Sequence, residues 1–220
     1  MYIANAKPRL IIYDLDETLV SANIVYLLTF NMLLEHYNKP QQTQKYMDFI
    51  HSMTFEEVFS AWFGEKMLRQ IWDEYELYYQ ANSYNYCVPI KHSLEFVRKC
   101  NNISIKQIIM TNKPEFIAIP EIKRNGFLAH IDGVVCSDCG YSKDDDNRLN
   151  IILIKACIVD TINEIKSPEK LWIFGNSKDD MVMALKYNAT FFFTGYDMSV
   201  IKNFPNDRLV VFEDYTSILL

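Results

Sequence analysis

The sequence lacks the features of several large protein classes. It has no apolar run long enough to cross a membrane, because the nearest one, residues 24–34, is interrupted by Thr29 and Asn31. Its first residues have neither the basic region nor the apolar core of a secretion signal. Positive charge is also in deficit, since the formal net charge is −6 and no basic stripe is present. We therefore expect a cytoplasmic protein that binds neither membranes nor a nucleic-acid backbone.

Cysteine is scarce and does not pair evenly. The chain has 5 cysteines, and an odd number without a secretion signal favours free thiols in a reducing compartment. Cys136 and Cys139 have the spacing of half a zinc site, with His130 as the nearest further ligand. A structural zinc site needs four ligands, and no second cysteine pair supplies them. We interpret Cys136 as the end of a buried strand.

What the sequence does contain is a series of apolar runs separated by helical patterns. Each run has the composition of a strand that is buried on both faces. The chain is 220 residues long and half apolar, so it can bury a core of this kind. We predict an α/β fold with a doubly wound, mostly parallel sheet, and a short helix over residues 197–203. The expected strands are residues 10–13, 105–110, 131–135, 171–174, 190–194 and 208–212.

The first apolar run ends in two aspartates. Asp14 and Asp16 are two residues apart, so in an extended chain both carboxylates point the same way. Hard oxygen donors at the end of a strand suit Mg²⁺, and an aspartate can attack phosphorus as a covalent nucleophile. The alternative is an Asp-rich turn in which Thr18 caps the next helix.

The later runs also deliver polar groups at their ends. The second ends at Thr111 and Asn112, and the third leads into a polar loop that carries Lys143. The fourth is followed by Asn176 and Asp180. In open α/β sheets the ligand crevice lies at the carboxyl ends of the strands. We expect these groups to meet there.

These motifs resemble those of the haloacid dehalogenase superfamily, a large group of aspartate-nucleophile phosphohydrolases. The first family motif, Asp-x-Asp-x-Thr, matches residues 14–18, and the second, a Thr or Ser closing a strand, matches Thr111. Lys143 is the candidate for the third, a lysine after the next strand. The fourth, Gly-Asp-x-x-x-Asp, matches Gly175 and Asp180 but has Asn176 at its first acidic position. The resemblance covers residues 8 to 196.

The resemblance implies a Rossmann-like core and the hydrolysis of a small phosphomonoester through an aspartyl-phosphate. Asp14 would be the nucleophile and Asp16 the general acid and base. The groups that bind the transferred phosphoryl would be Thr111, Asn112 and Lys143. The cofactor would be Mg²⁺, with Mn²⁺ as the alternative, on Asp14, Asp16 through its backbone carbonyl, Asn176 and Asp180. The identity of the phosphoester is not encoded in any of these motifs.

Two lysines compete for the third motif. Lys155 is nearer in sequence to the fourth motif, but a helix starting near Asn147 would place it about 12 Å along the helix axis from the strand ends. Lys143 lies in the loop itself and is the better placed of the two. The alternative for Lys143 is a solvated lysine beside Asp144 and its acidic neighbours.

The stretch between the first two motifs is longer than one strand–helix–strand crossover requires. It is helical in pattern throughout, with a capping box at Thr54 and Glu57 and a helix-breaking Gly64. Its aromatic residues have the spacing of a packed helical core. An all-helical insert at this point resembles the family's α-helical cap, which closes over the site. We predict a cap of residues 22–85 and a core of residues 1–21 and 86–220. The hinges between them are expected near residues 20–23 and 82–88, with the return turn at 82–85.

Asn176 is the main departure from the family pattern. An Asp would place an anionic oxygen on the metal, whereas Asn offers a neutral amide carbonyl. We expect activity that needs high Mg²⁺ or Mn²⁺, and an inactive binding protein on the same fold stays open. A phosphomutase would use the same first motif and stays open too. A dehalogenase is disfavoured, because it needs no Mg²⁺ and the matching enzymes lack an acid at the position of Asp16.

Overall fold

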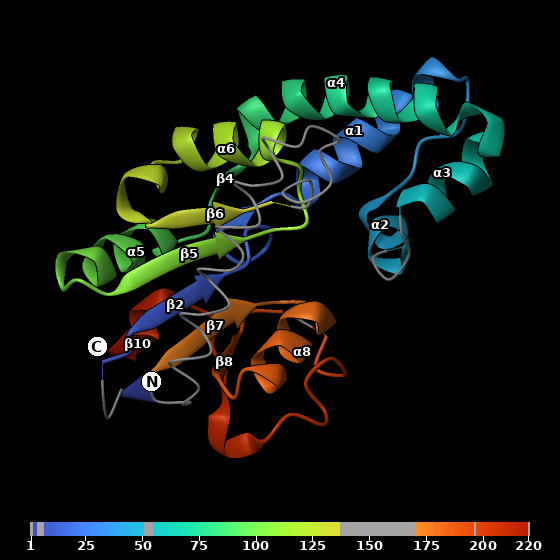
Figure 1. The fold of residues 1–220 in the computed structure, drawn as a ribbon. Helices are drawn as coiled ribbons and strands as arrows, with labels where there is room; N and C mark the ends of the chain where they lie inside the picture. Colours follow the sequence, from blue (N-terminus) through green and yellow to red (C-terminus); the bar gives the residue numbers. More distant parts are fainter. Residues whose placement is uncertain (1, 4–6, 51–54, 137–169, 196, 220) are drawn as a thin grey trace, which may run out of the picture. The chain divides into compact units, whose positions relative to one another are not determined.

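The computed structural model describes residues 2–3, 7–50, 55–136, 170–195 and 197–219 (Figure 1). The chain divides into two compact units. One consists of Met1–Val20 with Pro89–Leu220, and the other of Ser21–Val88. Among the residues that the model describes, no helix has both the length and the apolar character needed to span a bilayer.

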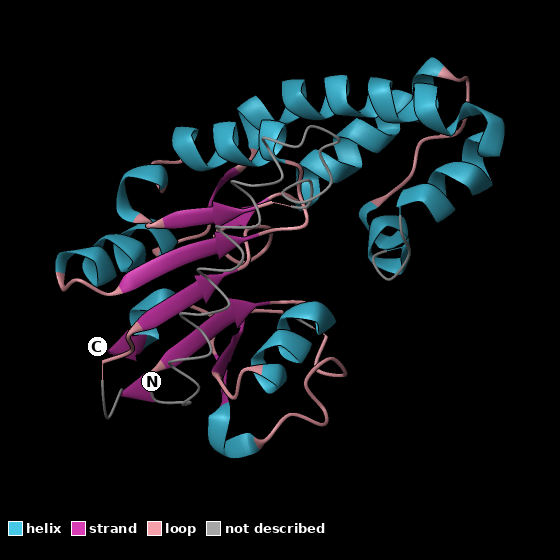
Figure 2. Ribbon diagram, viewed as in Figure 1, coloured by secondary structure: helices cyan, strands magenta, loops and turns pink. Residues whose placement is uncertain are grey.

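The larger unit is built on a sheet of six parallel strands (Figure 2). Its strands lie in the order β6-β5-β2-β7-β8-β9, and each neighbouring pair is parallel. The strands are β2 (Leu10–Tyr13), β5 (Lys106–Met110), β6 (Gly133–Val135), β7 (Leu171–Gly175), β8 (Thr190–Phe193) and β9 (Leu209–Val211). In the register of the central strand, Ile12 lies opposite both Ile108 of β5 and Ile173 of β7.

Both faces of this sheet are covered. Ile12 belongs to a buried cluster that includes Met181 of α8. Tyr13, the next residue along β2, faces the other side of the sheet and contacts Phe174 there. Phe96 of α5 packs against the same Phe174, with ring centroids 5.5 Å apart. The helices of this unit are α5 (Ser93–Asn102), α6 (Glu115–Arg124) and α8 (Lys178–Lys186). Because apolar side chains of both phases are buried, the predicted doubly wound α/β fold is confirmed.

Short elements complete the larger unit and join it to the smaller one. Two parallel strands, β1 and β10, form a small separate sheet. The chain crosses between the units at β3 and β4, which pair with each other. These elements are β1 (Tyr2–Ile3), β3 (Val20–Ser21), β4 (Val88–Pro89), β10 (Ile218–Leu219) and the 3-10 turns η2 (Leu128–His130), η3 (Asn206–Arg208) and η4 (Tyr215–Ser217).

The smaller unit is helical. Its described elements are α1 (Asn23–His36), α2 (Gln44–Ile50), α3 (Phe55–Phe63), the 3-10 turn η1 (Glu65–Met67) and α4 (Leu68–Tyr86). Aromatic rings fill its interior, since Phe59 lies 5.2 Å from Trp72 and 5.3 Å from Tyr75 between ring centroids. Gly64 ends α3 at a φ of 85°, a conformation that favours glycine. The aromatic cluster is therefore the core of this unit.

Residues 82–85 are helical and do not form the turn expected there, because α4 continues through that segment to Tyr86. Ser83 is buried there, and Asn82 Nδ2 donates to Thr29 Oγ1 of α1 at 3.2 Å. Packing against a neighbouring helix thus satisfies polar side chains that would otherwise favour a turn. The two units divide between Val88 and Pro89, at the end of the expected hinge region of residues 82–88.

The short helix predicted over residues 197–203 is also wrong. The segment forms successive turns, with Val200 N donating to Asp197 O at 3.1 Å and Phe204 N to Ile201 O at 2.9 Å. The Asp197 carboxylate accepts from Ser199 N at 2.9 Å. Such a local bond from a side chain to the backbone competes with helix formation.

Candidate active site

The site lies where the order of the strands reverses. From β2 the chain builds outward through β5 and β6 on one side, and through β7, β8 and β9 on the other. Ligands of open α/β sheets bind at such a point, outside the carboxyl ends of the strands. Asp14, Thr111 and Asn176 are the residues that directly follow β2, β5 and β7. The sheet thus brings one residue from each of the first, second and fourth motifs to the same edge.

Backbone hydrogen bonds hold the first two of these residues in line with their strands. Asp14 N donates to Phe174 O at 2.9 Å, and Thr111 N donates to Val135 O at 2.9 Å. Each strand therefore stays paired up to the functional residue that follows it. A side chain placed by a sheet in this way is held more rigidly than one placed by a free loop.

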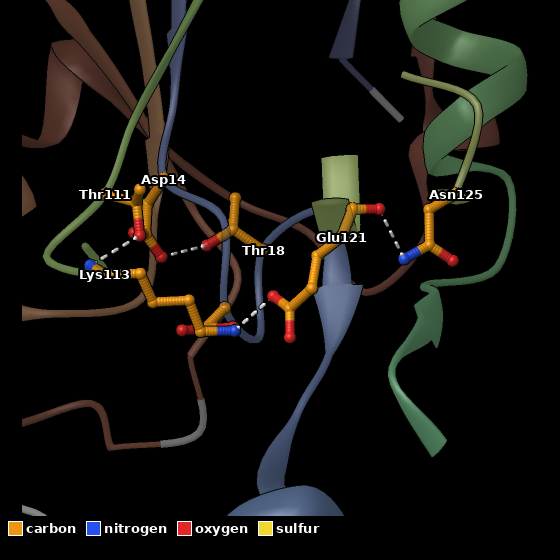
Figure 3. Close-up of polar contacts among 7 residues, drawn as sticks. Asp14, Thr18, Thr111, Lys113, Glu121 and Asn125 are labelled. Atoms are coloured by element: carbon orange, nitrogen blue, oxygen red, sulfur yellow. Dashed lines mark hydrogen bonds and ion pairs between the residues drawn. The ribbon is translucent and has the colours of Figure 1, made fainter. Parts of the chain in front are cut away.

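A tight turn follows Asp14 and returns Thr18 to it. Glu17 has a φ of 53°, and its N–H donates to Val20 O at 2.7 Å. The fully buried Thr18 donates its hydroxyl to Asp14 Oδ2 at 3.1 Å (Figure 3). The alternative role for Thr18 as a helix cap is wrong, because Ala22 is the N-cap of α1. The threonine instead orients the first aspartate.

Asp14 sits among other acids. Burial raises the pKa of the Asp14 carboxyl well above its ordinary value, and the charges of Asp180 and Asp16 raise that pKa further. Hydrogen bonds from the Leu15 N–H and the Thr18 hydroxyl oppose this rise in pKa. The site therefore concentrates negative charge around one carboxylate.

Asp180 organises the loop after β7. Its Oδ2 accepts from Asn176 N at 3.2 Å, Ser177 N at 3.0 Å and Ser177 Oγ at 2.6 Å. Ser177 Oγ in turn accepts from Asp180 N, which completes a capping box at the start of α8. Burial raises the pKa of Asp180, while these hydrogen bonds lower it. The carboxylate thus shapes the loop that carries Asn176.

Gly175 is required by space in this loop. A Cβ built on it would lie 2.3 Å from Asp180 Cγ, far inside van der Waals contact. The glycine that matches the fourth motif therefore lets the Asp180 side chain pass close to the end of β7. Its backbone conformation does not itself demand glycine, since its φ is not positive.

The second motif supplies both a hydroxyl and an unexpected cation. Thr111 Oγ1 accepts from Lys113 N at 3.2 Å, and Asn112 between them is exposed. The Lys113 ammonium contacts Asp16 Oδ1 at 2.6 Å. It also contacts Glu121 Oε2 of α6 at 2.6 Å (Figure 3). The second aspartate of the first motif is thus paired with a lysine of the second motif.

The sequence reasoning missed Lys113 as a functional residue. The two lysines that it weighed, Lys143 and Lys155, both lie outside the described residues, so their roles stay predictions. Lys113 stands directly after Thr111 and Asn112 in the sequence. A charged residue so close to a buried strand end was the available signal.

In the described residues, acidic side chains alone do not form a metal site. In the described part of the chain, no three His, Cys, Asp or Glu side chains gather as a metal cluster. The predicted set instead combines the Asp14 carboxylate, the Asp16 carbonyl, the Asn176 amide and Asp180. Mg²⁺ commonly takes one or two carboxylates and keeps water or substrate oxygens for the rest. The negative charges of Asp16 and Asp180, which raise the pKa of Asp14, fit a divalent cation beside it on charge grounds.

Comparison with solved structures gives full-length matches at low identity. A haloacid dehalogenase-like hydrolase from Streptococcus pneumoniae has a TM-score of 0.74 at 18% identity, over 96% of this chain and 96% of that one. A predicted phosphoglycolate phosphatase from Haemophilus somnus has a TM-score of 0.73 at 16% identity, over 97% of each chain. A protein provisionally described as a β-phosphoglucomutase from Thermotoga maritima has a TM-score of 0.67 at 16% identity, over 94% of each. These similarities establish a shared fold.

Sequence comparison is more specific about the family. No curated protein matches the chain. The family model for haloacid dehalogenase-like hydrolases, however, matches residues 11–194, which include the ends of β2, β5 and β7. The match spans the motifs that meet at the site and most of the chain. The protein therefore belongs to the haloacid dehalogenase-like hydrolases.

Proposed function

We propose that this hydrolase is a phosphatase that cleaves a small-molecule phosphomonoester through an aspartyl-phosphate intermediate. The observation that supports it most strongly is the setting of Asp14. Its carboxylate follows the central strand, is oriented by Thr18 and lies within the electrostatic influence of Asp16 and Asp180. Like charges repel one another, so carboxylates that are held within each other's influence point to a chemical function.

The first step transfers the phosphoryl group to Asp14. Thr18 contacts Oδ2, so Oδ1 is the oxygen that attacks phosphorus in line with the leaving oxygen. As the new bond forms, the bond from phosphorus to the leaving oxygen breaks and its electron pair stays on that oxygen. Asp16, protonated on the oxygen that Lys113 does not contact, donates its proton there, and the product leaves as an alcohol.

The second step returns the enzyme to its starting state. Asp16, now a carboxylate, takes a proton from water, and the water oxygen attacks phosphorus. The bond between phosphorus and Asp14 breaks, its electron pair returns to the carboxylate, and inorganic phosphate leaves. Each proton that Asp16 gives in the first step is thus recovered in the second.

The phosphoryl oxygens need hydrogen-bond donors and positive charge around them. Thr111 Oγ1 accepts from Lys113 N, so its own hydrogen can be donated to a phosphoryl oxygen. The exposed Asn112 adds a further donor beside it. Lys143 stays the predicted cation for the same oxygens. These groups bind the anion that an aspartate nucleophile would otherwise repel.

Bound beside Asp14, Mg²⁺ would neutralise charge on both the nucleophile and the phosphate. The groups that would hold it are the Asp14 carboxylate, the Asp16 carbonyl and the Asn176 side chain, with Asp180 behind them. An amide at position 176 binds a hard cation with less charge attraction than a carboxylate. We therefore expect the metal affinity to be low and Mn²⁺ to substitute for Mg²⁺.

The test is phosphate release from p-nitrophenyl phosphate and a panel of small phosphoesters across a Mg²⁺ and Mn²⁺ titration. We expect metal-dependent turnover that Asp14→Asn removes by at least about 100-fold, because the nucleophile is lost. Asn176→Asp should lower the metal concentration at half-maximal rate. Turnover that survives Asp14→Asn, or no turnover by folded wild-type protein, would contradict the phosphatase.

The same assay separates a second reaction. The Thermotoga maritima neighbour described as a β-phosphoglucomutase shares the fold, and a mutase would hold the phosphoryl group on the same aspartate. Formation of an isomeric sugar phosphate without release of inorganic phosphate would identify that reaction. Release of phosphate from several unrelated esters would favour the phosphatase.

We place the reaction in the cytoplasm, on a small soluble substrate. Cys100, in the described part of the chain, is a buried free thiol, which suits a reducing compartment. A net charge of −6 disfavours a nucleic-acid substrate.

A further inference from the structure

Lys113 is a buried cation between two carboxylates. Its side chain is 7% exposed, that of Glu121 is 1% exposed and that of Asp16 is 20% exposed. Both contacts of the ammonium measure 2.6 Å. The lysine thus joins an acid in the interior of the unit to an acid at the proposed site.

The backbone holds this lysine in place from two directions. Lys113 N donates to Thr111 Oγ1, and Pro114 at the next position is the N-cap of α6. Glu121 lies two turns along that helix, where Asn125 Nδ2 donates to its backbone oxygen at 3.0 Å. The position of the ammonium is therefore set by a strand end and by a helix together.

Fold stability is a weak reason for such an arrangement. Removing a lysine and a glutamate from water costs several kcal/mol per ion, and pairing them commonly does no more than offset that cost. An apolar pair of similar volume would stabilise the same space at least as well. The group that gains from the lysine is Asp16, whose carboxylate is fixed through Oδ1.

We propose that Lys113 is a positioning residue for Asp16, held in register by the buried Glu121. The proposal rests on the phosphatase function above, in which Asp16 gives a proton to the leaving oxygen. A carboxyl that must reach one oxygen atom works best when its rotation is restricted. Lys113 restricts that rotation from the side of α6 without itself touching the substrate.

This role has a signature that other roles of a lysine lack. A good leaving group needs little help from an acid, whereas a poor one depends on it strongly. Loss of Lys113 should therefore slow the hydrolysis of esters of weakly acidic alcohols most. A lysine that bound the phosphoryl group would instead slow all esters alike, because every substrate carries the same phosphate.

The experiment measures kcat/KM for p-nitrophenyl, p-chlorophenyl and phenyl phosphate, because that parameter reports the step in which the leaving group departs. The variants are Lys113→Met and the double variant Lys113→Met with Glu121→Leu, which removes both buried charges. Lys123→Met is the matched control, since it is the same change at an exposed position of α6. Circular dichroism checks the fold of each variant.

We expect the Lys113 variants to lose less than about tenfold on p-nitrophenyl phosphate and about 100-fold or more on phenyl phosphate. Lys123→Met should match the wild type on all three esters. An equal loss on the three esters, or no loss, would overturn the positioning role. Failure of both Lys113 variants to fold would overturn it as well, because the pair would then serve the fold.

The wild type and Asp14→Asn are measured in the same series. If the wild type hydrolyses none of the esters, or Asp14→Asn retains the activity, the phosphatase proposal fails and the role of Lys113 fails with it. If the activity depends on Asp14 and the leaving-group dependence is unchanged in the Lys113 variants, only the role of Lys113 fails.

Discussion

Asp14 is a residue under electrostatic stress. Its carboxyl loses water on burial and meets the charges of Asp180 and Asp16, and both effects raise its pKa. The burial and nearby charges that make Asp14 a candidate nucleophile should therefore also destabilise the folded state. Functional residues often carry such a cost.

We predict that Asp14→Asn stabilises the metal-free protein at neutral pH. Because the folded-state pKa of Asp14 is raised, the folded protein binds its proton more tightly than the unfolded chain does. The favourable contribution of this group to stability is therefore complete below the unfolded pKa and is lost as pH rises through the folded one. The neutral Asn avoids that loss.

The measurement is thermal unfolding in EDTA between pH 3 and pH 8. Each kcal/mol gained should raise Tm by about 2–4 °C for a protein of this size, and the difference from wild type should shrink toward acid pH. Asp179→Asn, at an exposed position of α8, is the control and should show little change. A Tm difference that grew toward acid pH would contradict the assignment.

For single residues, the sequence predicted the position correctly where the residue directly follows a strand. Asp14 and Thr111 directly follow buried strands, so their places were set by local pattern alone. Lys113 was missed because its role depends on Glu121 of α6, and no spacing rule links a loop lysine to a helix glutamate. Thr18 was interpreted as a possible helix cap, although the turn at Glu17 directs it to Asp14.

Among the elements, the junction of β7 and α8 is tightly packed. Gly175 ends the strand, Ser177 caps the helix, and Asp180 closes the capping box over the glycine. The fourth motif is therefore a structural unit in its own right. Its acid shapes the loop, whatever further role it has with a metal.

We predict that Gly175→Ala destabilises the protein by about 1–3 kcal/mol or more, as overpacking usually does. The added Cβ would lie 2.3 Å from Asp180 Cγ and would push that side chain out of its capping box. Phosphatase activity should fall too, since the loop that carries Asn176 would shift. The measurement is urea unfolding together with the phosphate-release assay.

Gly133→Ala is the control for this change, because a Cβ at Gly133 would meet nothing within 4 Å. It should leave both stability and activity near the wild-type values. Equal behaviour of the two alanine variants would show that Asp180 does not require the space at Gly175.

Element boundaries were harder to predict than element types. The strands follow from apolar runs between polar ends, and the burial of both faces of the sheet follows from their apolar composition, whereas the order of the strands was not predicted. Helix α4, however, continues to Tyr86 through a segment rich in polar residues that favour turns. Its contacts with α1 outweigh local propensity, and such contacts are not written in a local pattern.

Across the whole chain, a residue near the carboxyl end supports the site near the amino end. The buried Tyr215 donates its hydroxyl to Thr18 O at 2.8 Å, beneath the turn that follows Asp14. Its ring stacks on Phe174 of β7 with centroids 5.8 Å apart. The final segment of the chain thus completes the packing behind the first motif.

We predict that Tyr215→Phe destabilises the protein by about 1–3 kcal/mol, because the Thr18 carbonyl loses its donor in a buried place. Activity should also fall, since Thr18 orients Asp14. Tyr187→Phe, at a partly buried ring, is the control and should stay within about 0.5 kcal/mol of wild type. Identical urea midpoints for the two variants would refute the role of Tyr215.

The central position of β2 has a consequence for how the protein is made. This strand is synthesised before both of its partners, Lys106–Met110 and Leu171–Gly175, because they follow it in the chain. Until the second of them emerges, a strand that is apolar on both faces has an unpaired edge, which is prone to aggregation. Nascent chains that stop before residue 171 should therefore depend on chaperones, and the nucleophile should reach its working geometry only after residue 175 has been synthesised.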